Sequence, residues 1–521
     1  MNKIPPLDIA KTELSTIEKI GQFFMPAAFI NDTEEEIKAL ETLIKKHGIG
    51  GICFFHSRAS AATNFEGKKK VVRNEASLKT LKGLIKRYQA ASKYPLLIAI
   101  DAEWGLAMRI ENTPQYPYAI TLGAIVNDDD ELIYEVGRNI ARDCISAGIH
   151  WNLAPVVDIN NNPNNPVIGY RSFGDNREQV YTKAAAFIRG TESLGVLTSI
   201  KHFPGHGDTA VDSHLGIPII NKSKEELLQN ELYPYQKIIE EGVDSVMVGH
   251  LSIPALANGN ETPASISKEI ITGFLREEMR YTGVVISDAL NMHAVSKDYP
   301  VPGELEWLAY DAGNDVLCFS EHVKEGIQSI TKNSSTQQIE ETFSRVWNLK
   351  RKAIKNPILN KLGERYGHSK LNRNIAEESI TLYHGKENTI EKFSNTSFCT
   401  LTLERKDVNQ NAIEILEFLK TAEKEIQEEQ NILLLLTPPK VKPASNFGFL
   451  DKEIEFINNM ISSKNVVLYH FGNPYALKLF ETDKSLATVI VYQDFKEFQD
   501  VAANHFQGRI KAKGELPVSL I

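Results

Sequence analysis

The chain has 521 residues, which is more than one hydrophobic core usually covers, so we expect about two domains. A hydrophobic fraction of 42% and a charged fraction of 24% are ordinary for a globular protein that folds in water. The formal net charge of −9 argues against general nucleic-acid binding, and no stretch approaches the ~20 apolar residues of a membrane-spanning helix. We therefore expect neither a nucleic-acid partner nor insertion into a membrane.

The first residues, MNKIPPLDIAKTE, lack the apolar core of a signal peptide. They predict a cytoplasmic protein if Met1 is native, and a periplasmic or secreted one if an export signal was removed before this sequence begins. The four cysteines, at positions 53, 144, 318 and 399, show neither metal-binding nor redox spacing, so we expect free thiols.

Short apolar runs alternate with amphipathic helical segments over residues 1–355, always in the same order. The runs are unbroken, as expected for parallel strands buried on both faces. They lie at residues 23–29, 49–55, 96–101, 150–159, 196–203, 245–250, 283–289 and 315–320. Eight such βα units predict an α/β chain whose first domain is a (β/α)₈ TIM-like barrel. An open doubly wound sheet is the alternative, because a count of strands does not show closure.

The segment at 356–374 is predicted to be a linker, and residues 375–521 a second, smaller α/β domain with an open sheet. Its strand candidates are SFCTLTL, NILLLLTPP, KNVVLYHF and SLATVIVY, and its first long helix is NAIEILEFLKTAEKEI.

Polar residues gather at the ends of the predicted barrel strands, which is where barrels of this kind carry out chemistry. An aspartate at such a position can also simply cap the next helix. A buried lysine, in contrast, needs a carboxylate or a ligand hydroxyl as partner. The candidates are Asp101, Asp158, Arg171 in the loop after the fourth strand, Lys201, His202, His250 and Asp288.

The stretch IKHFPGHGDTAVDSHLGIP, residues 200–218, holds three histidines and two aspartates. His202 and His206 are four residues apart, a spacing found in some zinc sites. Pro204 and two glycines make a helix unlikely here, so the spacing does not place both rings on one face. A loop-built metal site stays open as a weaker alternative.

Asp212 and His214 in the same stretch predict proton transfer. In an extended loop, residues two apart point the same way, so the carboxylate can orient the imidazole and raise its basicity. His214 would then act as a general acid and base, and Asp288 as a nucleophile from another strand.

The motif KHFPGHGDTAVDSH resembles the signature of the family 3 glycoside hydrolases, in particular their bacterial β-N-acetylglucosaminidase branch. The similarity extends in the same order to NPNNPVIGYRSFG, LREEMRYTGVVISDAL and the terminal GRIKAKGELPVSLI. It implies a TIM-like barrel followed by an α/β sandwich domain.

Carried over position by position, the resemblance makes Asp288 the nucleophile and His214 with Asp212 the acid/base dyad. It implies that the sugar is bound by Asp101, Arg171, Lys201 and His202, and less directly by His250 and Asp158. One departure is DAEWG after the third strand, where Trp104 replaces an expected glycine. Its indole could stack on a neighbouring sugar or only pack.

These residues predict a retaining, exo-acting β-N-acetylglucosaminidase that hydrolyses terminal N-acetyl-β-glucosaminides of peptidoglycan or chitin type by double displacement. No metal and no organic cofactor is required, and the only predicted partner is the carbohydrate substrate. Three alternatives stay open: a phosphorylase using the same residues, a metallohydrolase, and a non-catalytic sugar-binding protein.

Overall fold

The computed structural model describes residues 4–55, 74–126, 130–209, 216–355, 366–404 and 412–520. The chain divides into two compact units. The first, called the barrel unit here, comprises residues 1–116, 133–159 and 184–365. The second unit comprises residues 117–132, 160–183 and 366–521.

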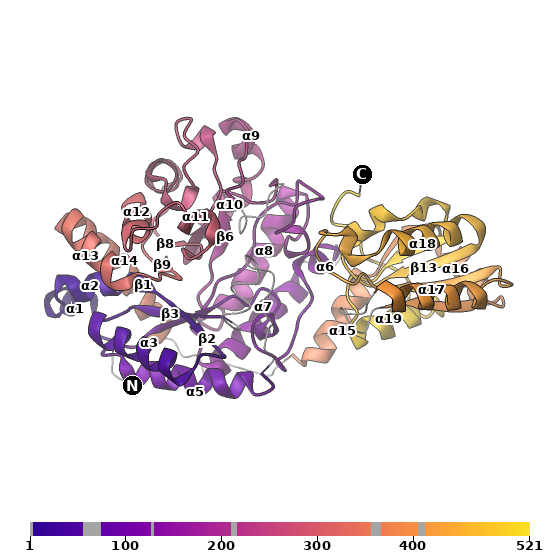
Figure 1. Ribbon diagram of the computed structural model, residues 1–521, viewed down its shortest axis with the longest axis horizontal. Coiled ribbons are helices and arrows are strands. Elements are labelled where there is room, and N and C mark those ends of the chain that lie inside the picture. The colour runs from indigo at the N-terminus through magenta and orange to yellow at the C-terminus, as the bar shows by residue number, and fades with distance from the viewer. Residues whose placement is uncertain are drawn as a thin grey trace. The chain divides into compact units, whose positions relative to one another are not determined.

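The barrel unit is built on a ring of short parallel strands with helices outside it (Figure 1). Strands β2, β3, β4 and β5 form one sheet and β6, β7 and β8 a second, and β1 pairs with β9. The strands are β1 (Phe24–Met25), β2 (Ala27–Phe29), β3 (Gly51–Phe55), β4 (Leu97–Ile100), β5 (Trp151–Asn152), β6 (Ile200–Phe203), β7 (Ser245–Val248), β8 (Val284–Ser287) and β9 (Leu317–Cys318).

Single parallel bridges join these sheets into a closed barrel. Trp151 bridges to Leu197 between β5 and β6, and Ile286 bridges to Val316 between β8 and β9. The last strand then pairs with the first, Cys318 lying opposite Met25. Since β1 and β2 are one strand interrupted at Pro26, eight strands close the ring within the described residues, and the predicted barrel is confirmed over the open sheet.

Helix α3 (Glu34–His47) shows how the sequence builds the outer layer. The Thr33 hydroxyl accepts from the Glu36 backbone N–H, and the Glu36 carboxylate accepts from Thr33 N–H, so both ends of the capping box are satisfied. Ile37, Leu40 and Ile44 share the buried face. The helix ends at Gly48, whose φ of 63° lies in the left-handed region that favours glycine.

Further helices follow within residues 1–355. They are α1 (Leu7–Glu13), α2 (Thr16–Gly21), α5 (Ser77–Ala91), α7 (Glu131–Ala147), α8 (Arg177–Glu192), α9 (Lys224–Gln229), α10 (Tyr233–Glu241), η5 (Glu269–Glu278), α11 (His293–Ser296), α12 (Glu304–Ala312), α13 (Val323–Asn333) and α14 (Thr336–Lys355).

The second unit contains an open sheet of five strands in the order β10-β14-β13-β12-β11, parallel except for β10. The strands are β10 (Thr381–His384), β11 (Cys399–Leu403), β12 (Asn431–Leu436), β13 (Asn465–His470) and β14 (Ala487–Ile490). Helices α17 (Ala412–Glu425) and α18 (Asp451–Ser463) pack together, whereas α15 (His368–Ser379) and α16 (Glu387–Ser394) pack on α19 (Lys496–Phe506). This is the predicted second α/β domain.

The division of the chain is less linear than the predicted limits of 1–355 and 375–521. Residues 117–132 and 160–183 lie within the predicted barrel domain but pack with the second unit, because Gly123 and Gly174 sit directly against Pro517. Residues 368–374 of the predicted linker form the start of α15, which follows from the amphipathic pattern of HSKLNRNIAEES.

No helix in the described ranges is both long and apolar enough to cross a membrane. All four cysteines are free thiols, three of them buried.

Candidate active site at the carboxyl ends of the barrel strands

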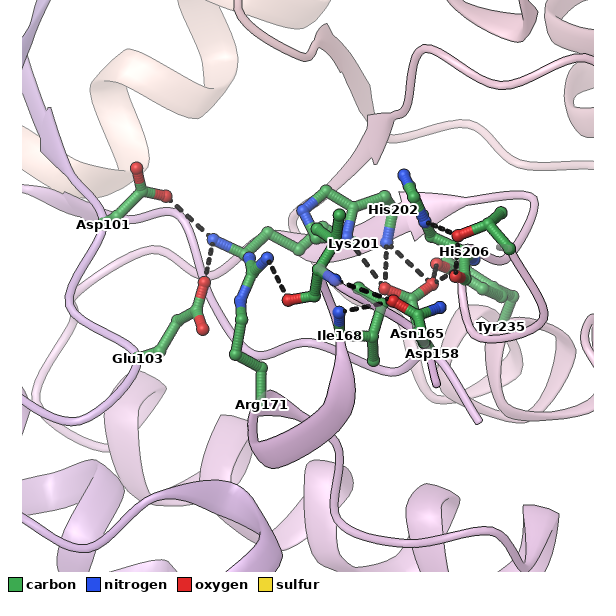
Figure 2. Close-up of polar contacts among 12 residues, drawn as sticks. Asp101, Glu103, Asp158, Asn165, Ile168, Arg171, Lys201, His202, His206 and Tyr235 are labelled. Atoms are coloured by element: carbon green, nitrogen blue, oxygen red, sulfur yellow. Dashed lines mark hydrogen bonds and ion pairs between the residues drawn. The ribbon is translucent and has the colours of Figure 1, made fainter. Parts of the chain in front are cut away.

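Lys201 on β6 lies at the centre of an ion-pair cluster in the barrel unit (Figure 2). Its Nζ is 2.8 Å from Asp101 Oδ1, just after β4, and 2.8 Å from Glu103 Oε1. Arg109 Nη2 is 2.9 Å from the other Asp101 oxygen, Oδ2. The Lys201 side chain is 2% exposed, so the two carboxylates compensate a cation that would otherwise be costly to bury.

The cations hold Asp101 in its ionised form. Burial alone would raise the pKa of Asp101, but the positive charges of Lys201 and Arg109 outweigh it and lower the pKa to about 2. The side chain stays 18% exposed, so a charged hydrogen-bond acceptor remains accessible at the end of β4. The Arg109 guanidinium also lies 3.7 Å from the centre of the Phe55 ring, which fixes its orientation.

Glu103 and Arg109 were not among the residues predicted from the sequence. Glu103 stands two positions after Asp101 in DAEWG, a spacing that can bring both carboxylates to one side of an extended segment. This spacing is the feature of the sequence from which a role for Glu103 beside Asp101 could have been predicted. Arg109 follows a short helical turn, η1 (Leu106–Met108), and the sequence gives no comparable signal for it.

Asp158 anchors the segment that follows β6 (Figure 2). Its side chain is fully buried and lies 2.8 Å from His202 Nδ1. It also accepts hydrogen bonds from the backbone N–H of His202 at 3.2 Å and of His206 at 2.7 Å, and from the Tyr235 hydroxyl at 3.4 Å. The predicted sugar-binding residue His202 is thus 6% exposed, with one ring nitrogen committed to Asp158.

The segment around His206 is a loop, as Pro204 and the two neighbouring glycines predict. A Cβ on Gly207 would lie 1.6 Å from the carbonyl oxygen of Ile159, so only glycine permits this approach. His206 Nδ1 lies 2.8 Å from Thr209 Oγ1. The segment is not helical, and within the described residues no three His, Cys, Asp or Glu side chains gather as a metal site.

Asp288 stands directly after β8, and its carboxylate is oriented locally. Asp288 Oδ1 accepts a hydrogen bond of 2.8 Å from the Ala289 backbone N–H. His250 in turn holds Ala289: its Nε2 donates to the Ala289 carbonyl at 2.9 Å, and its Nδ1 lies 2.6 Å from Ser265 Oγ. Because a carbonyl can only accept, Nε2 carries a proton.

The surroundings of His250 bear on the prediction that this residue binds the sugar. The side chain is completely buried, and both ring nitrogens already have protein partners. The residue fits the alternative of a satisfied interior histidine, here one that steadies the peptide next to Asp288.

Asp101 and Asp288 face the same end of the barrel. Both follow the carboxyl ends of parallel strands, which meet at one edge. The buried Cys318 thiol is sensitive to both carboxylates. A hydrogen bond with Cys53, burial, and the negative charges of Asp101 and Asp288 together raise the pKa of that thiol. The negative charges of both aspartates thus raise the pKa of the same buried thiol.

Arg171 lies in the second unit, in the short helix η2 (Gly169–Arg171). Asn165 Oδ1 accepts from the backbone N–H of Val167 at 2.9 Å and of Ile168 at 2.8 Å, which shapes the loop before it (Figure 2). Its role in sugar binding stays a prediction. The predicted dyad, Asp212 and His214, lies outside the described residues.

Comparisons with known proteins bear on this arrangement. The family model described as "Glycosyl hydrolase family 3 N terminal domain" matches residues 15–349. The chain is 31% identical over 374 residues to β-hexosaminidase A of Pseudoalteromonas piscicida, covering 66% of this chain and 60% of that protein's length.

Solved structures match nearly the whole chain, and two of them are described here by way of example. A family 3 β-N-acetylglucosaminidase from Paenibacillus sp. str. FPU-7 superposes with a TM-score of 0.77 at 25% identity, covering 97% of this chain and 99% of that one. A β-glucoside phosphorylase superposes with a TM-score of 0.79 at 22% identity, covering 99% and 96%, which shows a shared fold.

Proposed function

The chain belongs to glycosyl hydrolase family 3, and on this premise we propose that it is a retaining, exo-acting β-N-acetylglucosaminidase. The observation that carries the proposal is the placement of Asp288 and the Asp101–Lys201–Glu103 cluster at one end of the barrel. In this proposal the Asp288 carboxylate, which stands at a strand end, is the attacking group, and the cluster supplies charged hydrogen-bonding groups for a sugar. The β-hexosaminidase relative and the β-N-acetylglucosaminidase structure support the substrate class.

The Asp101 cluster would bind sugar hydroxyls. A carboxylate accepts hydrogen bonds from hydroxyls, and Lys201 donates to their oxygens. Because Lys201 and Arg109 lower the Asp101 pKa to about 2, the acceptor is ionised near neutral pH. Ion pairing before the substrate arrives reduces the reorganisation that binding requires.

The reaction would proceed in two displacements at the anomeric carbon. In the first, an Asp288 oxygen forms a bond to that carbon while the glycosidic bond breaks and His214 gives its proton to the departing oxygen. In the second, His214 takes a proton from water, whose oxygen attacks the same carbon and releases Asp288. Asp212 would hold the His214 tautomer and raise its basicity. Each step inverts the carbon, so the product keeps the β configuration.

Two measurements test this proposal. Aryl N-acetyl-β-glucosaminide, β-glucoside and β-xyloside should be compared by kcat/KM, and the proposal expects a preference of at least ~10²-fold for the first, as expected when a site hydrogen-bonds a substrate group that its competitors lack. Proton NMR of the first-formed sugar should show the β anomer. A β-glucoside preference would overturn the substrate class, and an α product the mechanism.

The product also separates hydrolysis from phosphorolysis. A β-glucoside phosphorylase shares this fold. Phosphorolysis would use phosphate in the second displacement, whereas our proposal assigns water. In phosphate buffer we expect free N-acetylglucosamine, and N-acetylglucosamine 1-phosphate as the main product would contradict hydrolysis.

A further inference from the structure

Arg109 uses little of its hydrogen-bonding capacity within the protein. A guanidinium carries five N–H donors. Arg109 Nη2 donates to Asp101 Oδ2 at 2.9 Å, and this is the only hydrogen bond that the side chain makes with the part of the chain that the structure describes. Arg109 Nε is buried and has no hydrogen-bond partner there. Because a buried donor without a partner is costly, this N–H points to an acceptor that the protein itself does not supply.

Other arginines of the barrel unit use more of their donors. Arg276 donates from both terminal nitrogens, to two backbone carbonyls and to a buried carboxylate. Arg87 is partly exposed on α5, and its three nitrogens all donate to Glu34 or Glu41. An arginine that only holds the fold together thus has several protein acceptors. Arg109 has one, although it lies beside Asp101 at the carboxyl ends of the strands.

The Arg109 guanidinium is held in place without the use of its donors. It lies over the Phe55 ring, 3.7 Å from the ring centre, and such stacking leaves the N–H bonds in the guanidinium plane available. Phe55 in turn makes edge contacts with Phe29 at 6.4 Å and with Phe319 at 5.7 Å between ring centres. Phe55 and Phe29 end β3 and β2, and Phe319 directly follows β9. The orientation of the guanidinium is therefore set at this end of the barrel before a ligand binds.

The charges around Arg109 indicate which kind of acceptor it would bind. Asp101 and Glu103 place two carboxylates in the same cluster, so an anionic ligand group would meet repulsion there. A neutral hydroxyl would not, and it both donates and accepts hydrogen bonds. It can donate to Asp101 while its oxygen accepts from Arg109. Both side chains are accessible, with exposed fractions of 17% for Arg109 and 18% for Asp101, so a sugar hydroxyl fits this position.

We propose that Arg109 binds the substrate directly, by donating a hydrogen bond to the oxygen of a hydroxyl on the terminal sugar. The inference rests on the proposed function, in which Asp101 accepts a hydrogen bond from a hydroxyl of the same sugar. That hydroxyl is then held from two sides, and a deoxy sugar that lacks it leaves both charged groups without this partner. Sites that hydrogen-bond a hydroxyl discriminate strongly against analogues that lack it. Arg109 therefore helps to determine which sugar the enzyme accepts.

The test compares Arg109→Met with the wild type on substrates that lack one hydroxyl. The substrates are 4-methylumbelliferyl N-acetyl-β-glucosaminide and its 3-, 4- and 6-deoxy analogues, and the penalty for each analogue is the parent kcat/KM divided by its own. The same penalties are measured in Asp101→Ala with and without Arg109→Met, which separates a direct contact from an effect through Asp101. Arg87→Met is the matched control, because it removes an arginine paired with two glutamates on the outer layer. Thermal melting verifies that each variant is folded.

At the hydroxyl with the largest penalty in the wild type, we expect Arg109→Met to reduce that penalty at least ~10-fold, as the loss of a charged hydrogen bond predicts. Arg109→Met should still reduce it when Asp101 is absent, and Arg87→Met should match the wild type throughout. Equal penalties in Arg109→Met and the wild type, or a reduction that disappears without Asp101, overturn this inference alone. A wild type that does not hydrolyse the parent substrate overturns the proposed function and this inference with it.

Discussion

The two ends of the barrel both carry charged residues, and they hold them in different ways. At the carboxyl ends, Asp101 follows β4 with 18% of its side chain exposed and a cation on each oxygen. At the amino ends, Asp315 precedes β9 and is completely buried between Arg276 and Arg345. Lys350, fully buried on α14, donates to Gln22 Oε1 and to the carbonyl of Gly50, just before β3.

The difference separates charges that a substrate can reach from charges that hold the barrel together. Asp315 Oδ2 also accepts the Val285 N–H at 2.9 Å, so the carboxylate ties two helices to two strands. Asp101, in contrast, forms its ion pairs with Arg109 and Lys201 at the open rim of the barrel. In barrels of this kind, the carboxyl end supports chemistry and the amino end supports stability. Substitutions at the two ends should therefore change different measured quantities.

The largest effect is expected for Asp101→Ala. It removes the accessible acceptor and one counter-charge of Lys201, so kcat/KM for an aryl N-acetyl-β-glucosaminide should fall ~10²- to 10³-fold. The melting temperature should change little, because Lys201 keeps Glu103. Asp298→Ala, at an exposed position, is the control. A kcat/KM within a few-fold of wild type would mean that the cluster does not contact the sugar.

Asp315→Ala should show the opposite pattern. Breaking a buried ion-pair network typically costs about 3 kcal/mol, so urea unfolding should report a loss of that order. The kcat/KM of the folded enzyme, measured well below its melting temperature, should stay near the wild-type value. A large loss of kcat/KM with unchanged stability would show that the two ends of the barrel are not functionally separate.

A smaller, pH-dependent effect is expected for Lys350→Met. Burial lowers the pKa of Lys350 from 10.5 to about 7. Between these values the unfolded lysine binds a proton that the folded one does not, so the free energy of unfolding should rise with pH in wild type. The contribution is at most about 1.4 kcal/mol per pH unit and should vanish in Lys350→Met.

Urea unfolding at pH 7, 8 and 9 measures this difference, with the exposed Lys332→Met as control. Parallel curves for wild type and Lys350→Met would contradict a neutral buried lysine.

Much of the barrel could be predicted from the sequence because buried parallel strands leave unbroken apolar runs, and each predicted run contains an observed strand. Closure could not be predicted, since it depends on Cys318 pairing with Met25 almost 300 residues away. The grouping of residues 117–132 and 160–183 with the second unit could not be predicted either. It depends on the packing of Gly123 and Gly174 on Pro517, which is far away in the sequence.

Site residues could be predicted from the sequence when their position at the end of a strand is enough to bring them to the rim of the barrel. Asp101 and Lys201 were candidates because of their places at strand ends, and the structure brings Lys201 Nζ within 2.8 Å of Asp101 Oδ1. Glu103 was missed because its role appears only when Lys201, 98 positions away in sequence, is folded beside it. His250 stands at a strand end like the others, but Ser265 and the Ala289 carbonyl turn its ring inward, and neither contact has a sequence signal.

The central claim is that Asp288 is the nucleophile at the open end of the barrel, and azide rescue tests it most directly. Asp288→Ala should lower turnover of 2,4-dinitrophenyl N-acetyl-β-glucosaminide at least ~10³-fold while the protein remains folded. Azide should then occupy the space of the lost carboxylate, attack from the same face and restore turnover, giving the α-glycosyl azide by NMR. Undiminished turnover without azide, or a β-glycosyl azide as product, would contradict the assignment.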